Sequence, residues 1–225
     1  MVLYRAVFLP RVLYGVRFWS HACSVHINTR KLNSLQRRAL LGVTSAYKTA
    51  STVSLQVLAG TLPLDLEAKL AAAKRVAKTL PAAEAVFSIE QAKTRVLDEW
   101  QERWSSSTKG RWTYSFFPSV RIRIQSPIWL NHQLSQYLTG HGNFRSKLNS
   151  FKLVPSPLCH CGTEEETAEH ALYRCPKYSQ QREVLELAVH RAGHLWPCPT
   201  STLVSTRALF KALESYANAT LNSAV

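Results

Sequence analysis

The residues with the most specific chemical potential are the cysteines and histidines of the segment CHCGTEEETAEHALYRC, residues 159–175. Their spacing is Cys159-x-Cys161-x8-His170-x4-Cys175, which offers three thiolates and one imidazole. A tetrahedral structural zinc site uses four ligands of these kinds. The His170-x4-Cys175 half has the spacing of a zinc knuckle, whereas the Cys159-x-Cys161 half is tighter than the usual C-x2-C pair. We therefore predict one structural zinc ion bound by these four side chains.

Two alternatives to this ligand set stay open. His160 lies between the first two cysteines and competes as a ligand, although thiolate is the softer and stronger zinc donor and favours Cys161. The segment would otherwise hold three incidental thiols and two exposed histidines. Because four protein ligands close a zinc site, zinc-bound water and hydrolysis are not expected. The intervening acids are expected in a solvated loop and helix start: Glu164, Glu165, Glu166 and Glu169.

The cysteine count and the opening segment bear on the compartment. The chain has five cysteines, and an odd number without a signal peptide favours a reducing, intracellular environment and metal binding over disulfides. The opening MVLYRAVFLPRVLYGVRFW is apolar, but Arg5, Pro10, Arg11 and Arg17 interrupt it. It is expected to be neither a signal peptide nor a membrane span, so no membrane partner is expected.

Positive charge is concentrated in the first two-thirds of the chain. Lys and Arg number 28 against 14 Asp and Glu, a net charge of +14 over 225 residues. Residues 1–80 carry +10, residues 81–160 carry +5 and residues 161–225 carry −1. This distribution favours a polyanionic partner, because each phosphate contact releases a counterion. RNA or DNA is therefore the expected partner, and the alternative is a soluble basic protein without a nucleic-acid role.

Two clusters of cations are predicted to form one phosphate-tracking surface. The first lies on an expected helix at 28–47 and the second on an expected helix at 64–80. Trp112, next to Lys109 and Arg111, is the best candidate for stacking on a base, although a packed core position is the commoner role of tryptophan. The cations of the two clusters are Arg30, Lys31, Arg37 and Arg38, followed by Lys74, Arg75 and Lys78.

The pattern of apolar residues predicts a mainly α protein. An amphipathic segment is expected at 2–19, and further helices are expected at 51–60, 88–105, 126–139, 177–191 and 201–217. The best strand candidate is VRIRI at 120–124, where apolar and basic residues alternate. The SSST run and Gly110 indicate a boundary. We therefore predict a basic helical domain at 1–106 and an α-rich domain with the zinc motif at 107–225.

Several segments resemble Pol polyproteins of non-LTR retrotransposons, in particular type-1 elements that insert into ribosomal DNA. They occur in the family's order and cover almost the whole chain. The run at 35–66 together with the Cys/His motif is specific, whereas any single piece is weak. The segments are LYRAVFLPRVLYGVRFW, LQRRALLGVTSAYKTASTVSLQVLAGTLPLDL (35–66), WQERW, GRWTY, LTGHGNFRSKLNSFKL, and the Cys/His motif followed by PKYSQQR (176–182).

This resemblance implies the C-terminal portion of a reverse transcriptase/endonuclease polyprotein, from a helical thumb onward. The basic region would grip a template–primer duplex, and the zinc region would dock on RNA or target DNA during target-primed reverse transcription. The upstream polymerase domain would be a partner, and the place of action would be the nucleus. As the alternative, the chain is a domesticated, zinc-containing helical module that binds a protein partner. Steep salt dependence would separate phosphate binding from such an interface.

A polymerase site is not expected in this chain by itself. A polymerase palm requires clustered aspartates that hold two metal ions. The chain has two aspartates, Asp65 and Asp98, and no Y-x-D-D motif. We therefore expect the fragment to have neither polymerase nor nuclease activity alone.

Overall fold

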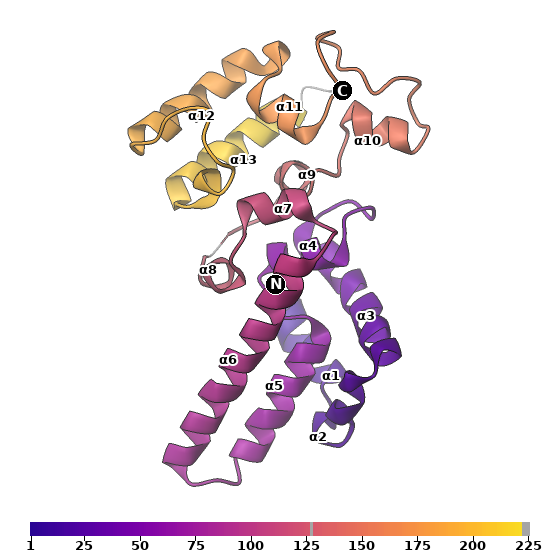
Figure 1. The fold of residues 1–225 in the computed structure, drawn as a ribbon, viewed down its shortest axis with the longest axis vertical. Coiled ribbons are helices and arrows are strands. Elements are labelled where there is room, and N and C mark those ends of the chain that lie inside the picture. Colours follow the sequence, from indigo (N-terminus) through magenta and orange to yellow (C-terminus); the bar gives the residue numbers. More distant parts are fainter. Residues whose placement is uncertain (127, 222–225) are drawn as a thin grey trace. The chain divides into compact units, whose positions relative to one another are not determined.

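A computed structural model describes residues 1–126 and 128–221, and within these ranges the chain is built from helices and loops without a β-strand (Figure 1). A single antiparallel bridge joins Leu158 and Glu165. The prediction of a mainly α fold is confirmed. The elements are η1 (Tyr4–Phe8), α1 (Leu9–Val12), α2 (Val16–Trp19), η2 (Ser20–Ser24), α3 (His26–Thr44), α4 (Thr52–Ala59), α5 (Leu64–Ala77), α6 (Ala82–Ser106), α7 (Arg111–Phe116), α8 (Val120–Gln125), α9 (His132–Thr139), α10 (Arg145–Ser150), α11 (Ala168–Tyr173), η3 (Pro176–Tyr178), α12 (Ser179–Arg191), η4 (Thr202–Val204) and α13 (Arg207–Leu221).

The chain divides into two compact units. Unit 1 comprises Met1–Val43, Ser51–Lys109 and Ser119–Ser126. Unit 2 comprises Thr44–Ala50, Gly110–Pro118 and the described part of Pro127–Val225. Each unit therefore includes a short segment from the other side of the predicted 106/107 boundary. Whether 1–106 and 107–225 are domains that fold independently stays a prediction, because compactness within one chain does not test it.

Unit 1 is organised around the paired helices α5 and α6, which lie side by side and are joined by a short turn (Figure 1). Pro81 stands at the start of α6, where proline is compatible with a helix. The buried faces carry Leu66 and Leu70 on α5 and the indoles of Trp100 and Trp104 on α6. Burial of this apolar surface stabilises the packed helix pair by about 25 cal/mol for each Å² of apolar surface that is removed from water.

A buried glutamine connects α3 to the rest of unit 1. The side chain of Gln36 donates to the Leu62 carbonyl and the Tyr4 hydroxyl, at 2.7 and 2.8 Å. Its amide oxygen accepts from the Leu64 backbone N–H and from Gln56 Nε2, at 3.0 and 2.8 Å. All of its polar atoms are therefore bonded, which stabilises a buried polar group that would otherwise be destabilising.

The predicted strand at 120–124 is wrong, because these residues form helix α8. The Ser119 side chain caps it by accepting from the Ile122 backbone N–H. Arg123 is buried and its guanidinium donates to the carbonyls of Leu58 and Ser126. A Cβ at Gly60 would lie 3.2 Å from that guanidinium, so glycine makes room for it. The tertiary contacts of the buried Arg123 thus override the alternating pattern.

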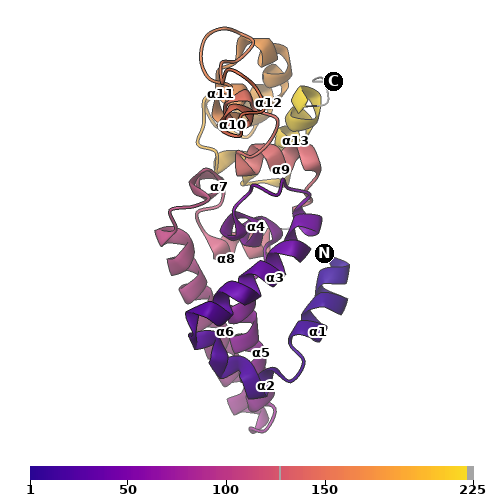
Figure 2. The ribbon, with the colours of Figure 1, turned by 90° about the vertical axis from the view of Figure 1, so that its right-hand side faces the viewer.

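Unit 2 is built on α12 and α13, which pack side by side, and on α9, which packs against α13 (Figure 2). Asn131 caps α9 and also donates to Glu214 and Asn218 of α13. The Tyr137 hydroxyl lies 2.9 Å from Thr220 Oγ1 within the same interface. The helix expected at 126–139 therefore starts later, at His132, and position 127 lies outside the described residues.

Candidate metal centre and basic residues

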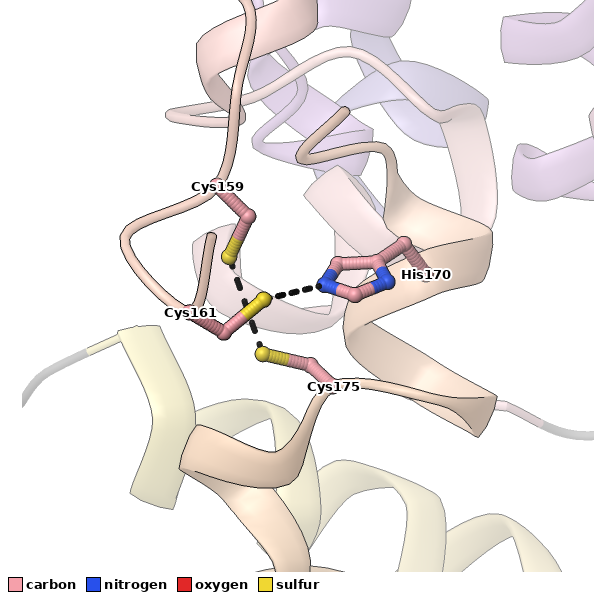
Figure 3. A group of neighbouring side chains, drawn as sticks. All are labelled: Cys159, Cys161, His170 and Cys175. Carbon is pink, nitrogen blue, oxygen red and sulfur yellow. Dashed lines mark hydrogen bonds between the residues drawn. The ribbon is translucent and has the colours of Figure 1, made fainter. Parts of the chain in front are cut away.

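The four predicted ligands come together in unit 2 (Figure 3). Their donor atoms all lie within 4.8 Å of one another. Cys159 Sγ is 3.7 Å from Cys175 Sγ, and Cys161 Sγ is 3.3 Å from His170 Nε2. Zinc bonds of about 2.3 Å to sulfur and about 2.0 Å to nitrogen give tetrahedral edges of about 3.8 and 3.5 Å. These two donor–donor distances are therefore close to the edges of a tetrahedral zinc site.

A tight turn presents the first two thiols. The Cys159 backbone N–H donates to the Glu164 carbonyl, and the Gly162 N–H donates to the Cys159 carbonyl, both at 2.9 Å. Gly162 has φ of +79°, a left-handed conformation that glycine adopts without strain. The bridge between Leu158 and Glu165 closes the turn. The turn therefore aims Cys159 and Cys161 at one point although only one residue separates them.

Helix α11 and the turn that follows it present the other two ligands. The Thr167 hydroxyl caps α11 by accepting from the His170 backbone N–H at 3.0 Å. The Cys175 N–H donates to the His170 carbonyl at 2.8 Å, which brings the chain back beneath the histidine. The imidazole is fully buried, with Nε2 toward the thiols.

The thiols differ in acidity. Burial raises the pKa of Cys159 to about 12 and also raises the pKa of Cys175. The hydroxyl of Thr163, 3.1 Å from Cys161 Sγ, is the main reason that the pKa of Cys161 falls to about 6. Thiolates are the metal-binding form. Two of the three thiols therefore need a nearby cation to ionise at neutral pH, which is what a bound zinc ion supplies.

A carboxylate lies beside the other nitrogen of the imidazole. His170 Nδ1 lies 3.0 Å from Glu164 Oε1, a contact that does not have hydrogen-bond geometry. Arg174 holds Glu164 through contacts of 2.9 Å and lowers the pKa of that carboxyl to about 2. A carboxylate at this place is the usual outer-shell partner of a zinc-bound histidine. Glu164 therefore contacts a predicted ligand, whereas the sequence predicted only a solvated loop position for it.

Two further residues of this segment are also placed by the structure. Glu166 is buried, and its carboxylate accepts from the Arg145 backbone N–H at the start of α10, at 3.2 Å. It is therefore not part of a solvated loop. His160 is exposed and its Nε2 lies 3.2 Å from an Arg145 guanidinium nitrogen. His160 is thus outside the group of four donor atoms.

The cations proposed for nucleic acid all lie in unit 1, and most are exposed. On α3, Arg37 is half-buried and donates to Thr52 Oγ1 at 3.1 Å, whereas the other three are exposed. Leu32 of α3 packs against the core residues Val16, Cys23 and Ala68, the last of which lies on α5. Nucleic-acid contact by these residues stays a prediction. The exposed cations are Arg30, Lys31 and Arg38 on α3, Lys74 and Arg75 on α5, and Lys78 directly after it.

Trp112 has packing contacts within unit 2. Its indole N–H donates to the Tyr137 carbonyl at 2.6 Å, and its ring packs edge-on against Phe116. A Cβ at Gly140 would lie 3.0 Å from the indole, so the ring closes over the end of α9. These contacts favour the core interpretation of the residue, and stacking on a base stays a prediction.

The two aspartates form separate ion pairs. Asp65 is fully buried, and its Oδ2 accepts from Arg103 at 2.7 Å. Asp98 is exposed and pairs with Arg121 at 2.6 Å. Both carboxylates therefore have structural partners, and the absence of polymerase and nuclease activity stays a prediction.

Within residues 1–126 and 128–221, no helix is both long enough and apolar enough to cross a membrane.

The sequence is similar to proteins of type-1 retrotransposable elements. It is 37% identical over 210 residues to a 115 kDa protein in the type-1 retrotransposable element R1DM of Drosophila melanogaster, covering 86% of this chain and 21% of the relative. It is 33% identical to the Pol polyprotein of element R1 4 from Nasonia vitripennis, covering 95% of this chain and 57% of the relative. A third relative, the R1 Pol polyprotein of Bradysia coprophila, is 33% identical over 81% of this chain and 20% of its own length.

These matches confirm the predicted family, although two other comparisons find nothing. No family model matches the chain. No solved structure matches it either. The chain spans between a fifth and three-fifths of the length of the relatives named above. Its sequence is that of a retrotransposon-derived protein, and it belongs with the Pol polyproteins of the type-1 retrotransposable elements R1 as a segment of such a polyprotein.

Proposed function

We propose that this chain is a nucleic-acid-binding portion of an R1 Pol polyprotein, which contacts RNA or target DNA during target-primed reverse transcription. The observation that carries the proposal is the four-donor cluster of Cys159, Cys161, His170 and Cys175, found in a basic chain of this family. The polymerase domain of the polyprotein would be its partner, and it would act in the nucleus.

Zinc is the ion that the cluster fits best. Three sulfurs and one imidazole nitrogen form the donor set of closed structural zinc sites. A bound ion would connect the turn at 159–164 to α11, in addition to the ion pair between Glu164 and Arg174. The role proposed for zinc is therefore to hold the fold of this part of unit 2.

Cations from both units support nucleic-acid contact. Unit 1 offers Arg30, Lys31 and Arg38 on α3. Unit 2 offers Lys147 and Lys152, on or next to α10, which the sequence analysis did not single out. Helix α10 is attached to the metal-binding segment, because Ser146 donates to the Glu166 carbonyl from both its backbone N–H and its hydroxyl. Phosphate contact by Lys147 and Lys152 would place the bound strand close to the metal centre of the same unit.

The test is the salt dependence of binding by the zinc-loaded full chain to single-stranded RNA, duplex DNA and an RNA–DNA hybrid. Each phosphate contact contributes about −0.9 to the slope of log K against log salt for a duplex and about −0.7 for a single strand. The variant combining Arg30→Ala, Lys31→Ala and Arg38→Ala should flatten the duplex slope by about 2–3.

The matched control replaces exposed cations on α13, Arg207→Ala with Lys211→Ala, and should leave the slope unchanged. Equal affinity of the triple variant and the parent at every salt concentration, with unchanged helicity, would exclude α3 as a phosphate surface. Salt-independent capture of a protein partner, together with no affinity for any of the three nucleic acids, would favour the protein-interaction module instead.

A further inference from the structure

A buried arginine of unit 2 has no role in the proposed nucleic-acid contact. Arg182 lies in the first half of α12 and is only 6% exposed. It is the last residue of the PKYSQQR segment that follows the Cys/His motif. A buried guanidinium is destabilising unless it is hydrogen-bonded and its charge is balanced. The surroundings of Arg182 therefore need to supply both.

Hydrogen bonds come from the backbone that carries two of the metal ligands. Arg182 Nε donates to the Leu172 carbonyl at 2.9 Å, and Nη2 donates to the carbonyls of Ala171 and Cys175 at 3.3 and 2.6 Å. The first two carbonyls belong to the last turn of α11, whose acceptors have no partner within the helix. The guanidinium thus fixes the turn that joins His170 to Cys175.

The balancing charge is not supplied by an acidic side chain. No carboxylate in the part of the chain that the structure describes forms an ion pair with Arg182. The neighbouring Tyr216 donates its hydroxyl to the Ala171 carbonyl, which Arg182 also contacts. The metal cluster adjoins the guanidinium, because Cys175, whose carbonyl Arg182 contacts, is one of the four donors. Three thiolates, a neutral imidazole and a divalent zinc ion leave one net negative charge.

We propose that Arg182 is a positioning residue of the metal centre: it fixes the His170–Cys175 half of the site through three backbone carbonyls and balances the negative charge of the zinc-loaded cluster. This inference rests on the proposed zinc site. A positioning role means that the guanidinium stabilises the zinc-loaded form more than the metal-free form. A residue that only packs would stabilise both forms equally.

The experiment compares the full chain with Arg182→Met, Arg182→Lys and the control Arg191→Met, which removes an exposed arginine from the same helix. Zinc affinity is measured by competition with a chelator of known affinity, and thermal unfolding is measured with and without zinc. Loss of an outer-shell partner typically weakens metal affinity by about 10–100-fold. We expect a loss in this range for Arg182→Met, a smaller loss for Arg182→Lys and wild-type affinity for Arg191→Met.

A second readout separates positioning from packing. Arg182→Met should reduce the zinc-induced increase in Tm, because the loaded form loses more stability than the metal-free form. Co²⁺ substitution should show visible bands of tetrahedral S₃N coordination in the parent and altered bands in Arg182→Met. Arg182→Lys keeps the charge without the fork of donors, so it remains informative if the methionine variant does not fold.

The outcomes distinguish this inference from the proposed site. If the parent binds one zinc ion and Arg182→Met binds it within twofold of the parent affinity, the inference is wrong and the zinc site stands. If Arg182→Met loses equal stability with and without zinc, the arginine is only a packing residue. A parent that binds no zinc would overturn both.

Discussion

Unit 1 and unit 2 satisfy their buried polar groups in different ways. In unit 1, Gln36 is bonded on all sides by neighbouring protein groups, and Asp65 pairs with Arg103. In unit 2, a buried histidine and Arg182 lie beside a cluster of thiols, and no acidic partner pairs with that arginine among the described residues. The metal-binding part of unit 2 is therefore expected to depend on an ion, whereas no cluster of metal-binding side chains lies among the described residues of unit 1.

The largest predicted effect is loss of the ion from unit 2. Cys175→Ser should reduce bound zinc from one equivalent to none, because a buried donor of the tetrahedral set is removed. Structural zinc sites contribute about 10–16 kcal/mol of apparent binding free energy in small domains, so α11 and its neighbours should lose protection against hydrogen exchange. Metal analysis and peptide-resolved hydrogen exchange measure the two effects.

The matched control is Cys198→Ser, which replaces a buried thiol of the same unit outside the cluster. It should keep one equivalent of zinc. Peptides of α5 and α6 should keep their protection in both variants and after chelation. Collapse of protection in α5 and α6 on chelation would contradict the contrast between the units.

The next effect concerns the buried ion pair of unit 1. Asp65→Asn should destabilise the chain by about 1–3 kcal/mol, less than for a fully buried pair because Arg103 is partly exposed and also contacts Glu99. Zinc stoichiometry should not change. Chemical denaturation, with circular dichroism as the signal, measures the free energy of unfolding.

Asp98→Asn serves as the comparison, since both members of its pair with Arg121 are exposed. It should lower the free energy of unfolding by less than about 1 kcal/mol. Equal losses for the two aspartate variants would show that burial of Asp65 has no energetic consequence.

The third prediction concerns phosphate contact by two lysines of unit 2. Lys147→Ala combined with Lys152→Ala should flatten the salt slope for single-stranded RNA by about 1–1.5. The effect should disappear when zinc is removed, because α10 is attached to the metal-binding segment through Glu166. Fluorescence anisotropy over a salt series measures it. An unchanged slope in the zinc-loaded double variant would assign phosphate contact to other residues.

The smallest predicted effects come from removing the N-terminal caps of two helices, one in each unit. Ser51 caps α4 in unit 1, and Thr167 caps α11, the helix that carries His170, in unit 2. Replacing either residue with Ala should cost about 1 kcal/mol of stability. Only Thr167→Ala should also weaken zinc binding, and chelator competition measures this. Reduced zinc affinity in Ser51→Ala would mean that unit 1 contributes to the site.

Features that depend on residues close together along the chain could be predicted from the sequence. Features that depend on contacts between distant residues could not. Helix α4 was predicted within one residue at each end, because the Ser51 cap and Gly60 are local signals. The proximity of the four donors could be predicted from their spacing, since three of the four lie in or next to short turns, and metal binding by them stays a prediction. Residues 120–124 failed because the partner of Arg123 is the Leu58 carbonyl, which is 65 residues away.

The sequence by itself determined the mainly α character, the family and the four candidate ligands. Each of these depends on composition, on periodicity or on motifs in which the residues concerned are neighbours along the chain. Only the tertiary structure decided that Glu164 lies against His170, that Trp112 closes over the end of α9, and that Arg182 contacts the ligand-bearing turn. These contacts depend on how helices and loops pack, and a side chain's type does not specify which distant backbone group it will meet.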